Sequence, residues 1–499
     1  MDRPTPTPRR LLLGGIAWLL ALAGCMHAGP PSQRAGQGWP EVRGPVSSAS
    51  LAPCVLEGVE GSADCGTLQV PEDWGAPEGR RINLRLIVLR ATGAAPTGDP
   101  VYLLTGGPGQ AATERVVEFA RELARTRVQR DLVLVDQRGT GGSNPLRCET
   151  PQEDDPEEFL RQRARACLER HAASADVRLY TTPYAAADLE AVRLALGHER
   201  INLDGGSYGT RLALVYLRRY PDRVRTVVLR GVSPPDFRNP LPFSKAGQAA
   251  LEALLAGCAR DAKCRGAFPR VGEEFRQVLD ALERAPVDVE LKPEQGTAKT
   301  VRISRERFTQ LVHLMLFIPS LTSRLPFLIH RAAQGHFEDF AGLAVAFEAA
   351  IAAQIYWGLQ LAVVCPEDLA RITPEDIAHE TPGTFLGDHL IRSYQAICGE
   401  WPQAPLPADY WQLVQVHVPA LLFSGDRDPS TPPRFGEEVA RHLPRGRHIV
   451  LPGATHIHAS ECMDRAISDF IAAGSAEGID VACLQEPYPW EFFVPEGKE

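Results

Sequence analysis

The sequence predicts an α/β fold: a mostly parallel sheet with helices, into which a largely helical segment is inserted. Short, nearly continuous apolar runs that end in glycine turns suit the buried strands of such a sheet: VYLLTGG, DLVLVDQRG and INLDGG. Segments of helical period lie between them, and strands that alternate with helices are typical of this class. Between residues 236 and 400 the alternation stops and helical periodicity dominates. With 499 residues, 44% of them hydrophobic, the chain can bury both a core and an inserted lid.

The first residues have the pattern of a targeting segment. Arg3, Arg9 and Arg10 precede the apolar run LLLGGIAWLLALAG, which is too short for a membrane span. The run ends in Leu-Ala-Gly-Cys25 and resembles a bacterial lipoprotein signal, in which residues 1–24 are removed and Cys25 carries the lipid. An ordinary secretory signal is the alternative. The resemblance implies attachment to the cell envelope, on the periplasmic or surface side of the outer membrane, because Met26 rather than aspartate follows the cysteine.

The rest of the chain divides into four regions. Residues 25–50, rich in Gly, Pro, Ser and Ala, predict a flexible tether. Residues 51–235 predict the first part of the core, with antiparallel strands at CGTLQVPEDW and RINLRLIVLRAT and helices at about 111–127 and 184–196. Residues 236–400 predict the helical cap, with one extended pair at VDVELKP and KTVRIS. Residues 401–499 predict the second part of the core, with strands at VPALLFSGD and RHIVLPGAT and a helix at about 459–473.

The eleven cysteines indicate an oxidising compartment. If Cys25 carries lipid, ten remain, and an even number in an exported chain favours disulfides, although buried free thiols stay an alternative. The spacing suggests sequential pairs: Cys54–Cys65, Cys148–Cys167, Cys258–Cys264, Cys365–Cys398 and Cys462–Cys483. No Cys-x-x-Cys occurs, so we expect no zinc site. A formal net charge of −9 without a long basic run argues against a nucleic-acid partner.

Ser207 is the predicted nucleophile. It lies at the centre of a G-x-S-x-G pattern, Gly205 to Gly209, between a predicted strand and a predicted helix. In such a turn the serine adopts a positive φ, so the residues two before and two after it must lack side chains. The following helix points its N-terminus at the serine and favours negative charge there. Glycine-rich turns without chemistry share this pattern, so an oxyanion hole, an acid and a base must accompany it.

A second glycine turn, Thr105-Gly106-Gly107-Pro108-Gly109, follows the strand VYLL. The backbone N–H of Gly107, with that of Tyr208, is predicted to form the oxyanion hole, and Gly106 is the second choice. Neither G-x-G-x-x-G nor the Walker spacing is present, so we expect no bound nucleotide and no cofactor.

Two later strand ends supply the predicted acid and base. Asp428, in the turn after VPALLFS, is predicted to orient the catalytic imidazole, with Asp426 as the alternative. His456, after RHIVLP, is the predicted base, with His458 as the alternative. These two histidines lack a third ligand motif, so we expect no metal. The order Ser207, Asp428, His456 is that of the α/β-hydrolases.

Five segments carry a more specific resemblance: TGGPG, VDQRGTGGSNPL, DGGSYGTRLALVYLRRYPDRV, GDRDPSTPP and PGATH. Together they resemble the prolyl aminopeptidase and tripeptidyl aminopeptidase family of serine peptidases, over roughly residues 50–483 and most closely its tripeptidyl branch. The resemblance implies an α/β-hydrolase core, a helical cap and the release of short N-terminal units from peptides. The family's usual HGGPG is TGGPG here, which weakens a strict proline-iminopeptidase assignment.

An aminopeptidase must also bind a free ammonium group. Glu367 and Asp368 are the predicted carboxylates, because the family often carries a cysteine followed by an acidic pair where the cap returns to the core. A solvated helix N-terminus is the alternative. Arg138 is predicted to make structural hydrogen bonds, and Tyr356 and Trp357 either line the lid or fill its core.

The leading hypothesis is an exported serine aminopeptidase that takes one to three residues from peptide N-termini. A hydrolase of small acyl esters on the same fold is the alternative, because the triad does not choose between ester and amide. A non-catalytic binding lipoprotein is a third possibility, against which the complete Ser207, Asp428 and His456 argue.

Overall fold

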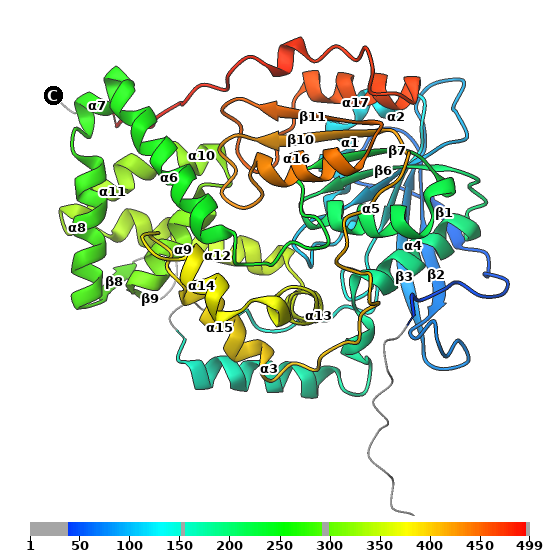
Figure 1. Cartoon of the computed structure of the whole chain (residues 1–499), viewed down its shortest axis with the longest axis horizontal. Helices are drawn as coiled ribbons and strands as arrows, with labels where there is room; N and C mark the ends of the chain where they lie inside the picture. The colour runs from blue at the N-terminus through cyan, green and yellow to red at the C-terminus, as the bar shows by residue number, and fades with distance from the viewer. Residues whose placement is uncertain (1–37, 151–154, 292–298, 496–499) are drawn as a thin grey trace, which may run out of the picture.

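The computed structural model describes residues 38–150, 155–291 and 299–495 and has the predicted α/β architecture (Figure 1). Its core is a nine-stranded sheet of order β1-β2-β3-β5-β4-β6-β7-β10-β11. The first three strands pair antiparallel and β3 joins β5 antiparallel, whereas all pairings from β5 to β11 are parallel. The strands are β1 Ser50–Cys54, β2 Ala63–Pro71, β3 Arg81–Leu89, β4 Val101–Leu104, β5 Leu132–Val135, β6 Ile201–Gly206, β7 Val224–Arg230, β10 Ala420–Gly425 and β11 Gly446–Leu451.

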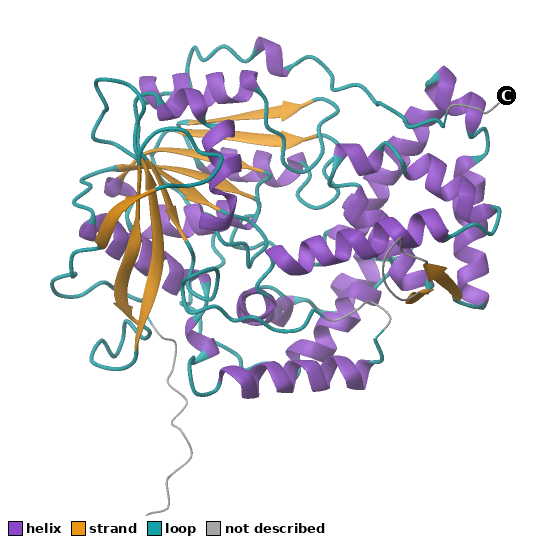
Figure 2. Cartoon of the chain, turned by 180° about the vertical axis from the view of Figure 1, so that it is seen from behind, coloured by secondary structure: helices purple, strands orange, loops and turns teal. Residues whose placement is uncertain are grey.

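Helices cover both faces of the sheet, which explains the apolar runs of its central strands. On one face α4, α5 and α16 pack against a cluster that includes Leu203 and Leu422. On the other face α1 and α17 pack around Leu103 and Phe423. Figure 2 shows these two helical layers on either side of the fanned strands. The helices are α1 Val116–Glu122, α4 Thr182–Ala195, α5 Tyr208–Arg219, α16 Pro433–His442 and α17 Glu461–Ala473.

The predicted lid is helical and has its own hydrophobic core, built from α6, α8, α9, α11 and α12. The extended pair predicted within it is present as the antiparallel strands β8 (Val287–Leu291) and β9 (Lys299–Ile303). The lid helices are α6 Phe243–Arg260, α7 Ala262–Ala267, α8 Val271–Arg284, α9 Arg305–Met315, α10 Pro319–Thr322, α11 Leu325–Ala333, α12 Glu338–Gln354, α13 Trp357–Glu367, α14 Pro374–Glu380 and α15 His389–Cys398. Within the described ranges, no helix combines the length and apolarity that a bilayer crossing requires.

One helix of the lid region comes from outside residues 236–400. Helix α3 (Glu157–His171) precedes the nucleophile turn in sequence but packs with α13 and α15 in one buried cluster (Figure 1). Its sequence, EEFLRQRARACLERH, is dominated by charged residues, so its few apolar positions gave no clear helical period. The lid therefore consists of the inserted segment together with this earlier helix.

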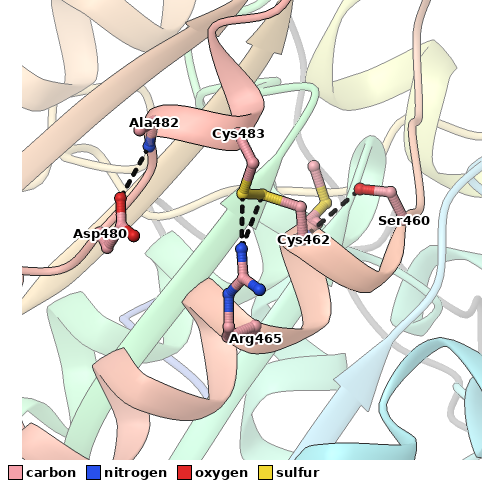
Figure 3. Close-up of a disulfide and its surroundings, with 7 residues drawn as sticks. Ser460, Cys462, Arg465, Asp480, Ala482 and Cys483 are labelled. Atoms are coloured by element: carbon pink, nitrogen blue, oxygen red, sulfur yellow. Dashed lines mark hydrogen bonds between the residues drawn. A yellow bond between two sulfur atoms is a disulfide. The ribbon is translucent and has the colours of Figure 1, made fainter.

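All five predicted disulfides are present in the structure, with Cα–Cα distances between 5.1 and 6.3 Å. Figure 3 shows Cys462–Cys483, which ties α17 to the segment that follows it, with the Arg465 guanidinium against both sulfur atoms. The pairs join residues near in sequence, so each closes a local loop. Cys25 lies outside the described residues, as do the rest of the predicted signal and the first part of the tether.

The predicted tether needs correction over its second half. Trp39 packs on the core next to Tyr410, and its indole Nε1 donates a hydrogen bond to Asp409 at 2.9 Å. Val42 and Val46 pack against the same core cluster. A Gly- and Pro-rich composition did not reveal these contacts, because one tryptophan and two valines are enough to dock an otherwise weakly apolar segment.

The sequence pattern assigns residues 485–495 to the core. In the structure this segment, the C-terminal strap, extends from the core to the lid. It runs over the top of the molecule toward α7 (Figure 1). Its Tyr488 N–H donates to the carbonyl of Pro452 in the core, at 2.9 Å, whereas its Phe493 N–H donates to Ser323 in the lid, at 3.0 Å. Trp490 lies against α6 so closely that a Cβ at Gly257 would be 2.2 Å from its indole nitrogen. The strap thus joins core and lid.

Candidate active site

Ser207 occupies the sharp turn between β6 and α5 with φ 54°. The flanking glycines are required there by close backbone approach. A Cβ at Gly205 would lie 2.5 Å from the carbonyl oxygen of Gly209, and a Cβ at Gly209 would lie 2.1 Å from that of Leu104. The Ser207 N–H donates to the carbonyl of Arg230 at 2.8 Å. The turn therefore holds the serine in a conformation that most residues avoid, with its hydroxyl at the carboxyl end of the sheet.

The structure brings Ser207, His456 and Asp428 into one hydrogen-bonded chain. His456 Nε2 lies 2.9 Å from Ser207 Oγ, and His456 Nδ1 lies 2.8 Å from Asp428 Oδ2. An ionised carboxylate can only accept, so Nδ1 carries the proton and Nε2 is left to accept the proton of the serine hydroxyl. Asp428 is 2% exposed. This is the arrangement that a serine nucleophile with an oriented general base requires.

Thr431 supports this chain and was not predicted from the sequence. Its N–H, together with the N–H of Ser430, donates to Asp428 Oδ1, each at 2.8 Å. Burial alone would raise the pKa of Asp428, but the His456 imidazole and the hydrogen bonds from His456 and Thr431 outweigh it and hold the pKa below its usual value. The Asp-x-x-Thr spacing, typical of a turn in which a carboxylate accepts from following N–H groups, could have pointed to this residue.

The alternative acid and base lie elsewhere. Asp426 accepts the Gly453 N–H at 2.6 Å and so joins the turns that follow β10 and β11. The ring of His458 packs at a tilt against the Tyr488 ring, with centroids 4.1 Å apart, and burial lowers the pKa of His458. Neither residue forms a hydrogen bond with the Ser207–His456 pair.

The glycine turn after β4 lies directly against the serine. A Cβ at Gly106 would be 3.0 Å from Ser207 Cβ. The Gly106 N–H donates to the side-chain oxygen of Gln110 at 3.2 Å, within the loop itself. Gly107 has φ 107°, and Tyr208 is the first residue of α5, where N–H groups lack intrahelical acceptors. The N–H groups of Gly107 and Tyr208 thus remain the predicted oxyanion donors.

The serine opens into a cavity of about 550 Å³ between core and lid. Lid residues meet the catalytic loops directly: the Phe317 ring packs edge-on against His456 at 5.1 Å, and buried His313 Nε2 bonds the carbonyl of Pro429 at 3.0 Å. Trp357 lines the cavity. Tyr356 is 2% exposed, so it belongs to the lid core although its hydroxyl reaches Glu114 at 2.7 Å.

Glu367 and Asp368 do not reach this cavity, and their predicted role must be corrected. They are 0% and 1% exposed. Arg211 donates to Asp368 Oδ1 at 2.8 Å and to Glu367 at 3.3 Å, and Thr182 donates to both oxygens of Glu367. Burial raises the pKa of Asp368 to about 6, although Arg211 faces it. These carboxylates fasten α13 to α4 and α5 and leave no room for a substrate ammonium.

Two other side-chain groups are structural. Arg138 is fully buried and pairs with both oxygens of Asp188 at 2.6 Å, as predicted.

Among the described residues, one group of side chains lies close enough together to hold a metal ion, namely Cys148, Cys167 and His171. The two cysteines are joined as a disulfide, so their sulfur atoms are not the thiolates that bind metals.

Comparison with known proteins agrees with this geometry. Residues 99–261 match a family described as the alpha/beta hydrolase fold, and residues 383–483 match a family described as TAP-like protein. The chain belongs to the tripeptidyl aminopeptidase-like α/β-hydrolases. It is similar to the serine protease Hip1 of Mycobacterium tuberculosis, with 26% identity over 97% of this chain and 99% of that protein. It is also similar to the tripeptidyl aminopeptidase of Streptomyces lividans, with 32% identity over 40% of this chain and 43% of that protein.

A solved structure, the proline iminopeptidase of Mycobacterium smegmatis, covers 82% of the chain with 98% of its own length, at 18% identity and a TM-score of 0.38. Membership of the tripeptidyl aminopeptidase-like family makes the chain an α/β-hydrolase enzyme, consistent with a serine peptidase.

Proposed function

We propose that this chain is an exported serine aminopeptidase that hydrolyses short peptides near their free N-terminus and releases one to three residues. The observation that carries the proposal is the hydrogen-bonded chain from Ser207 through His456 to Asp428, which opens into a lidded cavity. The names of the similar proteins, a serine protease and a tripeptidyl aminopeptidase, support peptides as the substrate class.

The proposed mechanism uses an acyl-enzyme. Ser207 Oγ attacks the scissile carbonyl carbon while His456 Nε2 takes the hydroxyl proton, and Asp428 stabilises the resulting imidazolium. The N–H groups of Gly107 and Tyr208 donate to the oxyanion. The imidazolium then protonates the leaving amine as the C–N bond breaks. Water, deprotonated by the same imidazole, releases the acyl product and restores the serine.

Labelling with a fluorophosphonate tests the nucleophile. We expect stoichiometric labelling of the wild type on Ser207, and none in Ser207→Ala. Absence of labelling in a folded wild-type protein would overturn the enzymatic assignment.

A digest of peptide pairs with free and acetylated N-termini tests the aminopeptidase assignment. We expect cleavage of the free peptides and of aminoacyl-naphthylamides, with the acetylated partners cut much more slowly. Equal cleavage of both would exclude an enzyme that recognises the free amine. Turnover of short acyl esters alone would favour an esterase.

We further propose that the protein is exported and held at the membrane by a lipid on Cys25. The five disulfides support an oxidising compartment. Mass spectrometry of the mature N-terminus tests this proposal. A mature chain that begins at lipid-modified Cys25 is the expected result, with the Cys25→Ala variant released from the membrane fraction, and a mature chain that begins at another residue would contradict it.

A further inference from the structure

The proposed activity requires a group that binds a protonated amine. Glu367 and Asp368 are buried away from the cavity, so another anion must supply this contact. Among the described residues that line the cavity, two carry a carboxylate, Glu118 and Glu122. Both belong to α1, and because they lie four residues apart they share one face of that helix.

The two carboxylates differ in burial and in partner. The Glu118 side chain is 58% exposed and pairs with Arg115, an arrangement that binds cations weakly in water. The Glu122 side chain is 22% exposed, and its Oε2 accepts a hydrogen bond from Arg230 Nη1 at 3.1 Å. Partial burial lowers the effective dielectric and strengthens attraction to an incoming positive charge. Glu122 is therefore the better binding group.

Arg230 links Glu122 to the nucleophile. Its Nε donates to Asp204 Oδ1 at 3.0 Å, and its carbonyl accepts the Ser207 N–H at 2.8 Å. The guanidinium thus fixes the Glu122 carboxylate relative to the serine turn. One guanidinium faces two carboxylates, so this group of side chains has one negative charge in excess when both are ionised. A ligand ammonium would neutralise it.

We propose that Glu122 binds the α-ammonium group of the peptide substrate, an inference that rests on the proposed aminopeptidase function. The lid contributes apolar residues such as Leu314, Phe317, Phe347 and Ile351 to the cavity wall, and these suit apolar side chains of the substrate. The arginine side chain spans the separation between the serine turn and Glu122. The length of one arginine side chain therefore limits the segment between the bound ammonium and the scissile carbonyl, in keeping with the proposed release of one to three residues.

The test compares the wild type with Glu122→Gln, a substitution that keeps the size and removes the charge. The measured quantity is the ratio of kcat/KM for a free tripeptidyl-naphthylamide to kcat/KM for its acetylated form. We expect this ratio to fall about 10- to 100-fold, the size of one charged hydrogen bond, and the loss to lie in KM. The matched control is Glu118→Gln, on the same helix face, which is expected to keep the wild-type ratio. Glu122→Asp keeps the charge, so we expect it to retain part of the wild-type ratio that Glu122→Gln loses.

The possible outcomes distinguish a failure of the Glu122 inference from a failure of the proposed aminopeptidase function. A wild type that cleaves both peptides equally contradicts the aminopeptidase function itself. If the wild type prefers the free peptide to the acetylated one and Glu122→Gln shows the same preference, only the role of Glu122 is overturned. An equal loss on both substrates, with reduced fluorophosphonate labelling, would show that Glu122 acts only through Arg230 on the serine turn. If Glu122→Gln fails to fold, Glu122→Asp decides, because a shorter carboxylate should raise KM for the free peptide alone.

Discussion

Thr431 Oγ1 donates a hydrogen bond to Asp428 Oδ2 at 2.7 Å and also lies 3.1 Å from His456 Nδ1. One hydroxyl therefore contacts both the acid and the base of the candidate triad. Because Asp428 is buried, this hydroxyl and two backbone N–H groups replace the water that would otherwise solvate the carboxylate.

Replacing Thr431 with valine should lower activity without loss of the fold. The variant loses a hydrogen bond to a charged group, about 1.5–3 kcal/mol, so kcat/KM is expected to fall about 10- to 100-fold. Steady-state kinetics on a free peptide would measure this. Thr381→Val, which removes a hydroxyl that donates to the Ile377 carbonyl at the end of α14, is the matched control and should keep wild-type kinetics. Unchanged kinetics in Thr431→Val would show that the backbone N–H groups suffice to hold Asp428.

The buried carboxylate of Asp368 predicts a pH dependence of stability. Its pKa is raised by burial to about 6 in the folded protein, above its unfolded value, so between these two values the folded state binds a proton that the unfolded state has released. Folding is therefore favoured as the pH falls from 6 toward 4. Relative to Asp368→Asn, the wild type should gain up to about 1.4 kcal/mol per pH unit across this window. Urea unfolding of both proteins at pH 4.5, 5.5 and 7 measures the difference, and a constant difference would contradict the raised pKa.

The disulfides should contribute to stability according to the loops that they close. Cys365–Cys398 has a sequence separation of 33 and Cys258–Cys264 a separation of 6. Chain entropy predicts losses of about 4 and about 2 kcal/mol when each pair is replaced by alanine. Denaturant unfolding of the two double variants under non-reducing conditions tests the order. A larger loss for the short loop would mean that packing, rather than chain entropy, dominates.

The C-terminal strap should hold the lid to the core. The Arg427 guanidinium carbon lies 3.8 Å from the centroid of the Trp490 ring. The Trp490 indole also lies against α6. Trp490→Ala is expected to cost about 2 kcal/mol, less than a fully buried tryptophan because Trp490 is half-buried. Hydrogen exchange in α6 should quicken in this variant. Glu491→Ala, at an exposed position of the same strap, is the control, and equal exchange in both variants would exclude a strap function.

Local patterns predicted much of this protein because they report backbone geometry. The glycines beside Ser207 mark a turn of positive φ, and apolar runs mark buried strands, so the α/β class, the serine turn and the antiparallel pair β2–β3 followed from the sequence. The chain order of Ser207, Asp428 and His456 placed three side chains at strand ends that a parallel sheet brings to one edge. Short sequence separations made the cysteine pairs predictable as well.

Only the tertiary structure decided which carboxylates face the substrate. Glu367 and Asp368 look like free acids in sequence, yet they meet Arg211 across 156 and 157 residues and are buried by it. Glu122 is the last residue of a short helix, and no sequence motif marks it as a binding residue. The packing of α1 nevertheless brings Glu122 to Arg230 and to the cavity. The reason is that periodicity and turn chemistry act over a few residues. The partner and burial of a long polar side chain depend instead on which distant segments the fold packs together.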